Sequence, residues 1–214
     1  NGLKDVYDCV DKLIQLPSTQ QALIHDQNEL LDGSLRLLDL CNTAKDVLSQ
    51  MKESVSELQS AIQRRQGDLA AETKRYLNSR KTVNKAIQKA FKGMETKKST
   101  SSNNGDAIDM LREAESIVLE VLENLLCFIC QSNSKSSSWS LVSKLIASKK
   151  TQVSANINEF AEVDASLKTS KSSEEIQAHL KNLQPCIQDL EEGVESLFRC
   201  LIKTRASILN VHNL

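Results

Sequence analysis

The stretch that decides the fold is residues 176–201, IQAHLKNLQPCIQDLEEGVESLFRCL. Its apolar residues recur in alternating steps of four and three, at Ile176, Leu180, Leu183, Ile187, Leu190, Val194, Leu197 and Leu201. This spacing is typical of a long helix that packs along a narrow seam. Ser172 or Ser173 is predicted to cap the helix, and Glu175 follows Ser172 at the spacing of a capping box. Pro185 lies inside the pattern, and we expect it to kink or divide the helix.

Working outward from this stretch, similar patterns predict further helices over most of the chain. They span about 3–16, from a cap at Ser18 or Thr19 to 65, from 68 to 97, 106–130 and 139–167. Pro17 ends the first of them, and Gly67 with Asp68 separates the second from the third. The prediction is an all-α fold: an elongated antiparallel helical bundle of about five long helices with coiled-coil-like seams.

The segment 97–105, KKSTSSNNG, is polar and has no periodicity. Such a composition predicts a flexible linker. We expect it to separate two hairpin-like halves within a single helical-bundle domain that covers residues 1–214.

The composition agrees with a helical bundle and excludes several other classes of protein. The chain has 40% hydrophobic residues but only six Gly and two Pro, too few turn residues for a sheet-rich fold. No run approaches the roughly 20 apolar residues of a membrane span, and no signal peptide pattern is present. The formal net charge of −1 argues against a dedicated nucleic-acid-binding protein. We therefore expect a soluble intracellular protein, cytoplasmic and with no nucleic-acid partner.

No group of residues predicts catalysis or metal binding. Cys127 and Cys130 form the only CxxC motif, and no second ligand pair lies nearby, so we expect two packed thiols without a disulfide or a metal. The histidines, His25, His179 and His212, are far apart and lack a nucleophile partner. The sequence therefore predicts no catalytic residues, no cofactor and no enzyme activity.

The strongest local anomaly is positive charge. Between Arg64 and Lys98 there are eleven Lys or Arg against three acidic residues, an excess of eight positive charges. Four of them follow helical steps of four and three and share one face, where like charges repel: Lys81, Lys85, Lys89 and Lys92. We expect the acidic helix at 106–130 to lie alongside and pair with these lysines. The alternative is an anionic partner outside the chain, either anionic lipid or an acidic protein segment.

Three segments resemble the plant BYPASS-related family, long catalogued as a plant domain of unknown function. They are VYDCV with LPSTQQAL in residues 6–23, ELLDGSLRLLD at 29–39 and LFRCLIKTR with SILN in 197–210. The resemblance spans essentially the whole chain. It implies a plant intracellular protein without assigned catalytic residues, from a family implicated in developmental control and root-to-shoot signalling. Two departures are the absence of a Ser-rich N-terminal segment and a stretch from His25 to Glu29 that is several residues shorter than usual in the family. A loop missing after His25 would explain the shorter stretch and would predict a break in the helix there.

These observations lead to three hypotheses about function. The first is a non-enzymatic regulatory helical protein that acts in development through protein–protein interaction. The second is a peripheral membrane-binding module that uses the basic helix 68–97. The third is a small-molecule-binding or catalytic bundle. A homo-oligomer is compatible with all three.

Overall fold

The computed structural model describes residues 2–64, 69–94, 106–130, 158–169 and 171–211. These ranges contain six helices and no strand, which confirms the predicted all-α class. The helices are α1 (Gly2–Ile14), α2 (Pro17–Arg64), α3 (Leu69–Met94), α4 (Asp106–Cys130), α6 (Glu159–Lys168) and α7 (Ser173–Val211).

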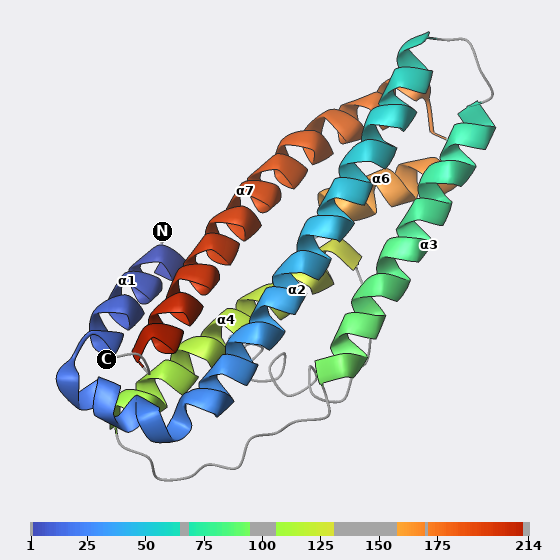
Figure 1. Cartoon of the computed structure of the whole chain (residues 1–214). Coiled ribbons are helices and arrows are strands. Elements are labelled where there is room, and N and C mark those ends of the chain that lie inside the picture. Colours follow the sequence, from blue (N-terminus) through green and yellow to red (C-terminus); the bar gives the residue numbers. More distant parts are fainter. Residues whose placement is uncertain (1, 65–68, 95–105, 131–157, 170, 212–214) are drawn as a thin grey trace, which may run out of the picture.

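The bundle is elongated because its two longest helices run along each other (Figure 1). α2 has 48 residues, which corresponds to about 72 Å at 1.5 Å per residue. α7 packs antiparallel to it, as the ion pairs Lys45–Glu195 and Lys52–Glu191 show. α3 and α4 also pack against α2, α6 packs against α7, and α1 lies beside the C-terminal half of α7 (Figure 1).

Two apolar cores hold these helices together. The larger contains buried side chains from all six helices, among them Met51, Tyr76 and Phe160. The smaller joins α1 to the N-terminal part of α2, the start of α4 and the end of α7. The predicted seam of α7 lies almost wholly inside: Ile176, Leu180, Leu183, Ile187, Val194, Leu197 and Leu201 are buried.

The start of α2 differs from the prediction, whereas the start of α7 agrees with it. α2 begins at Pro17, with Gln20 N–H donating to Leu16 O, so neither Ser18 nor Thr19 is the cap. Proline fits the first helical position because the missing N–H would have no helical partner there. Thr19 is instead completely buried. At α7 the prediction is confirmed, because Glu175 N–H donates to Ser172 Oγ.

The continuity of the helices also differs from the prediction, and some predicted features lie outside the described residues. The predicted helix 139–167 is wrong as a continuous element, because Asn158 is extended and caps a separate helix that begins at Glu159. Pro185 does not divide α7, and α2 runs without a loop after His25. The linker at 97–105, the break at Gly67 and Asp68, and residues 139–157 lie outside the described residues.

Candidate functional site

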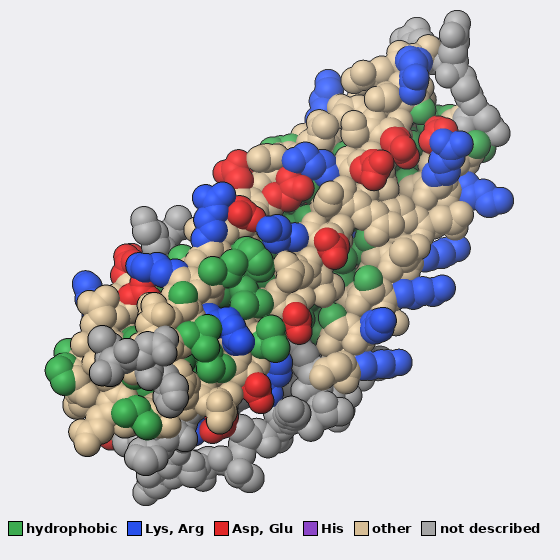
Figure 2. Space-filling view, viewed as in Figure 1, with side chains coloured by type: hydrophobic (Ala, Val, Ile, Leu, Met, Phe, Trp, Pro, Cys, Tyr) green, Lys and Arg blue, Asp and Glu red, His purple; other side chains and the backbone are tan. Residues whose placement is uncertain are grey.

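The lysines singled out by the sequence lie on the outer face of α3. The opposite face packs into the larger core through Tyr76, Val83 and Ile87, which are at most 1% exposed. Because these core residues alternate with the lysines at helical spacing, all four lysines point to solvent. The set Lys81, Lys85, Lys89 and Lys92, called the lysine row below, is exposed throughout. Figure 2 shows basic side chains projecting along this edge of the molecule.

The predicted pairing of the lysine row with the acidic helix is wrong for the residues that the structure describes. Each described ion pair uses other basic residues, and none of them contains a lysine of the row. The physical reason is the position of α4. It packs chiefly against α2 and meets α3 where Arg80 Nη1 donates to Ile129 O, near the end of α4.

Two of the acidic side chains of α4 have other described neighbours. Asp109 pairs with Arg112 on its own helix, and the Glu115 carboxyl lies against Gly33 of α2. Within the described residues, no ion pair relieves the repulsion among the lysines of the row.

Lys74 extends the same exposed face by two helical turns. It precedes Lys81 by seven residues, a spacing that places both on one side of a helix, and this signal could have added it to the row. From Lys74 to Lys92 the face is about 27 Å long at 1.5 Å per residue. No described residue of α3 is an exposed large hydrophobic side chain. The face can therefore attract a polyanion by charge but offers no apolar side chain for insertion.

A groove of about 460 Å³ lies between α2 and α3, and Lys89 forms part of its lining. Its α3 wall consists of small residues, Ala86, Ala90 and Gly93, and its α2 wall carries both Arg36 and acidic side chains. The mixed charge of this groove contrasts with the uniformly basic outer face beside it.

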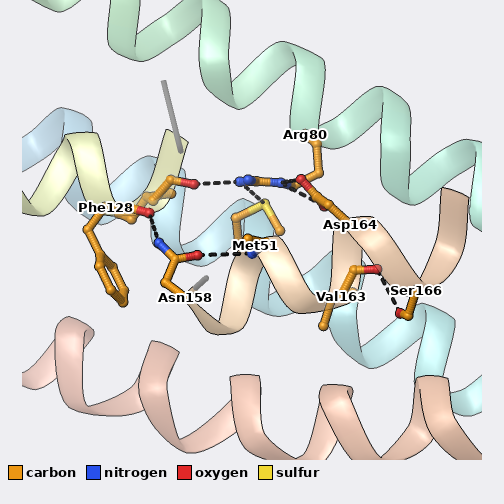
Figure 3. A network of polar contacts seen from close by, with 9 residues as sticks. Met51, Arg80, Phe128, Asn158, Val163, Asp164 and Ser166 are labelled. Carbon is orange, nitrogen blue, oxygen red and sulfur yellow. Dashed lines mark hydrogen bonds and ion pairs between the residues drawn. The ribbon is translucent and has the colours of Figure 1, made fainter. Parts of the chain in front are cut away.

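Arg80 is the basic residue of α3 that does not face solvent, and sequence reasoning missed it. Its side chain is 4% exposed, and Nε lies 3.0 Å and 3.1 Å from the two carboxylate oxygens of Asp164 (Figure 3). Nη1 donates to Ile129 O over 2.8 Å, and the guanidinium lies 5.3 Å from the centre of the Phe160 ring. One side chain thus connects α3, α4 and α6, which is a structural role.

Asn158 completes the attachment of α6. Its Oδ1 accepts from Ala161 N–H at 2.9 Å, and its Nδ2 donates to Phe128 O at 2.6 Å (Figure 3). The asparagine therefore caps α6 and binds it to α4 at the same time.

Two of the segments that carry the family resemblance meet in space at the other end of the bundle. Arg205 Nη1 donates to Leu31 O and to Ser34 Oγ. Gly33 lies so close to α4 that a Cβ there would come within 2.3 Å of Glu115 Oε2. Burial raises the pKa of Glu115 to about 8, against the opposing effect of Arg36. The glycine of the segment 29–39 is thus explained by the close approach of a buried carboxyl.

The cysteines are all thiols without disulfides. Cys130 is buried and Cys127 is partly buried on α4, and burial raises the pKa of Cys127. Burial also raises the pKa of Cys41 to about 12. Within the described ranges, no group of three His, Cys, Asp or Glu side chains is arranged to hold a metal ion. In those same ranges no helix has the length and apolar character needed to cross a membrane.

The fold and the site define a class: an all-α bundle whose outer helix presents an unpaired basic face. The family model described as Protein BPS1 matches residues 1–211, and the chain belongs to this family. The match confirms the resemblance to the BYPASS-related family found in the sequence. Neither a search of curated proteins nor a search of solved structures gave a match.

Proposed function

We propose that this protein is a non-enzymatic regulator that acts in the cytoplasm of plant cells, in developmental signalling, by binding an acidic protein partner through the lysine row. The observation that carries the proposal is the row itself: four exposed lysines in steps of four and three with no described ion pair. A helix with Asp or Glu at the same spacing would meet each lysine and relieve their mutual repulsion.

Attachment to an anionic membrane surface is the second candidate. It is favoured by the exposure of all four lysines on one face of an outer helix. In Figure 2, basic side chains project along this edge of the molecule. Each lysine near an anionic bilayer contributes about 1 kcal/mol, so four contribute about 4 kcal/mol, roughly a thousandfold in partitioning. Attachment would be reversible and sensitive to salt, because it would rest on charge alone and no apolar side chain beside the row would insert into the bilayer.

One pair of variants tests both candidates. The first changes Lys81, Lys85, Lys89 and Lys92 to Gln. The matched control changes to Gln four exposed lysines from other parts of the surface: Lys12, Lys168, Lys171 and Lys181. Both variants lower the formal net charge from −1 to −5, so only the position of the charge differs.

Affinity capture from plant extract addresses the protein partner. We expect a protein that elutes with moderate salt, is retained by wild type and the control variant, and is lost with the row variant. Equal capture by all three chains would contradict the proposal.

Co-sedimentation with phosphatidylserine-containing vesicles, at low and at physiological salt, addresses the membrane. We expect weak binding at physiological salt. Strong binding that the row variant loses and the control keeps would instead favour the second candidate.

A further inference from the structure

The seam between α2 and α7 changes character along its length. Toward the C-terminal half of α2 it is closed by the ion pairs Lys45–Glu195 and Lys52–Glu191. The other half carries apolar side chains from both helices, among them Leu35 at 47%, Ile202 at 48% and Leu209 at 45% exposure. Figure 2 shows hydrophobic side chains gathered on the surface where α2 and α7 lie side by side.

This apolar half, called the open seam below, has a regular construction. Its exposed members are Leu35 of α2 with Ile202 and Leu209 of α7. Leu31 and Leu38 of α2 and Phe198 of α7 continue the same faces and are partly buried against the cores. On each helix the spacings are three, four or seven, so each set lies on one face. A contiguous apolar patch on an otherwise charged surface marks an interaction site more often than single exposed residues do.

The α2 edge of the open seam is acidic, and the α7 edge carries an arginine. Asp32 and Asp39 are exposed on α2, and Asp39 also lines the groove toward α3. The Arg199 side chain on α7 is 76% exposed and pairs at 3.1 Å with Glu195 on the same helix. The contacts Gln27–Ile208 and Lys45–Glu195 fix the register of the two antiparallel helices. By interpolation between these contacts, Leu35 lies level with Ile202, and Asp39 lies level with Arg199.

This arrangement is self-complementary for one symmetry only. A two-fold axis parallel to the seam places α2 of one copy over α7 of the other. Each residue of the second copy then keeps its position along the seam axis. Leu35 then covers the partner copy's Ile202, and the acidic edge meets the partner copy's Arg199. A two-fold axis perpendicular to the seam, in the plane of the patch, would place α2 over α2 and acid against acid.

We propose that a second copy of this chain covers the open seam, in a symmetric dimer with α2 of each copy over α7 of the other. The open seam is about 16 Å long and two helices, about 20 Å, wide. That is less than the roughly 800 Å² per partner of a standard stable interface, so the dimer should be reversible at micromolar concentration. The lysine row of α3 takes no part in it, and the dimer is independent of the proposed function.

Sedimentation velocity of the full chain from low to high micromolar concentration tests the dimer. We expect the average mass to rise from one copy toward two. Leu35→Glu and Ile202→Glu should each raise the dissociation constant at least tenfold. Met110→Glu is the matched control, since Met110 is 58% exposed on α4, away from the seam, and it should dimerise like wild type.

A charge exchange tests the geometry without touching the apolar residues. Asp39→Arg and Arg199→Asp should each weaken the dimer severalfold, and the variant with both changes should recover most of the loss. Both positions are exposed. Arg199→Asp also removes the surface ion pair with Glu195, and because such pairs contribute little to stability, folding should be preserved. A wild type that stays monomeric at high concentration would overturn the proposal. The proposal would also be overturned if Leu35→Glu and Ile202→Glu dimerised like wild type. A double charge variant that dimerises no better than either single charge variant would overturn it as well.

Discussion

Replacing Arg80 with methionine should lower the free energy of unfolding by about 3 kcal/mol. Methionine keeps much of the apolar stem but removes two contacts to the Asp164 carboxylate and the donor to Ile129 O. Breaking one partner of a buried ion pair typically costs 3–5 kcal/mol, because the other charge stays buried without compensation. The Asp164 side chain is 14% exposed, so water relieves part of that penalty and the lower end of the range applies.

Urea unfolding followed by far-UV circular dichroism measures this loss. Arg75→Met is the matched control one turn earlier on α3. Its partner Glu72 lies on the same helix and the Arg75 side chain is 70% exposed, so we expect a change within about 0.5 kcal/mol. Arg80→Met combined with Asp164→Leu removes both charges and should be more stable than Arg80→Met alone.

The comparison among these variants decides whether the buried charge is what matters. If Arg80→Met costs no more than Arg75→Met, the ion pair does not stabilise the position of α6. If the double variant has a lower free energy of unfolding than Arg80→Met, removing the unpaired Asp164 charge has not helped. Packing of the Arg80 and Asp164 side chains, and not their charge pairing, would then stabilise this part of the bundle.

Three further predictions concern stability and reactivity. Gly33→Ala should destabilise the protein by about 1 kcal/mol, because the Glu115 carboxyl must move. At Gly193 a Cβ meets nothing within 4 Å, so Gly193→Ala should stabilise the protein by about 0.5–1 kcal/mol. Denaturant unfolding of both variants measures the difference. Because burial raises the pKa of Glu115 to about 8 from 4.5, the folded state holds a proton that the unfolded state releases, and stability should fall by about 1.4 kcal/mol per pH unit as pH rises from about 5 to 8. Glu115→Gln should remove this part of the slope, and an unchanged slope would contradict the assignment. A thiol reagent should modify exposed Cys9 before buried Cys130, as mass spectrometry of the partly labelled protein would show.

The long helices could be predicted because the helical spacing of their apolar residues is repeated many times along the sequence. The seam of α7 carries eight apolar residues in strict order, and seven of them are buried in the structure. The exposed face of α3 could be predicted for the same reason, since the core residues Tyr76, Val83 and Ile87 leave the lysines no other direction.

Contacts between distant segments could not be predicted in the same way. Arg80 shares the spacing of the buried residues Tyr76 and Val83, which is a local signal for burial. Its partner Asp164 lies 84 residues away, on a helix whose start was predicted wrongly. The pairing of the lysine row with α4 was predicted from chain order and opposite charge. It is wrong for the described residues because α4 packs chiefly on α2, and none of the described ion pairs joins its acidic residues to the lysine row.

Two arginines and the lysine row use their charge differently. Arg80 connects α3 to α4 and α6 through a carboxylate and a main-chain oxygen. Arg205 connects α7 to α2, where Nη1 donates to a main-chain oxygen and a hydroxyl. The planar guanidinium is suited to such fixed multiple contacts, whereas a lysine ammonium is a compact charge on a flexible stem. The lysine row contains only lysines, all exposed and without a described ion pair. Each adjacent pair in the row costs a few tenths of a kcal/mol in the isolated bundle, and no described ion pair compensates this cost.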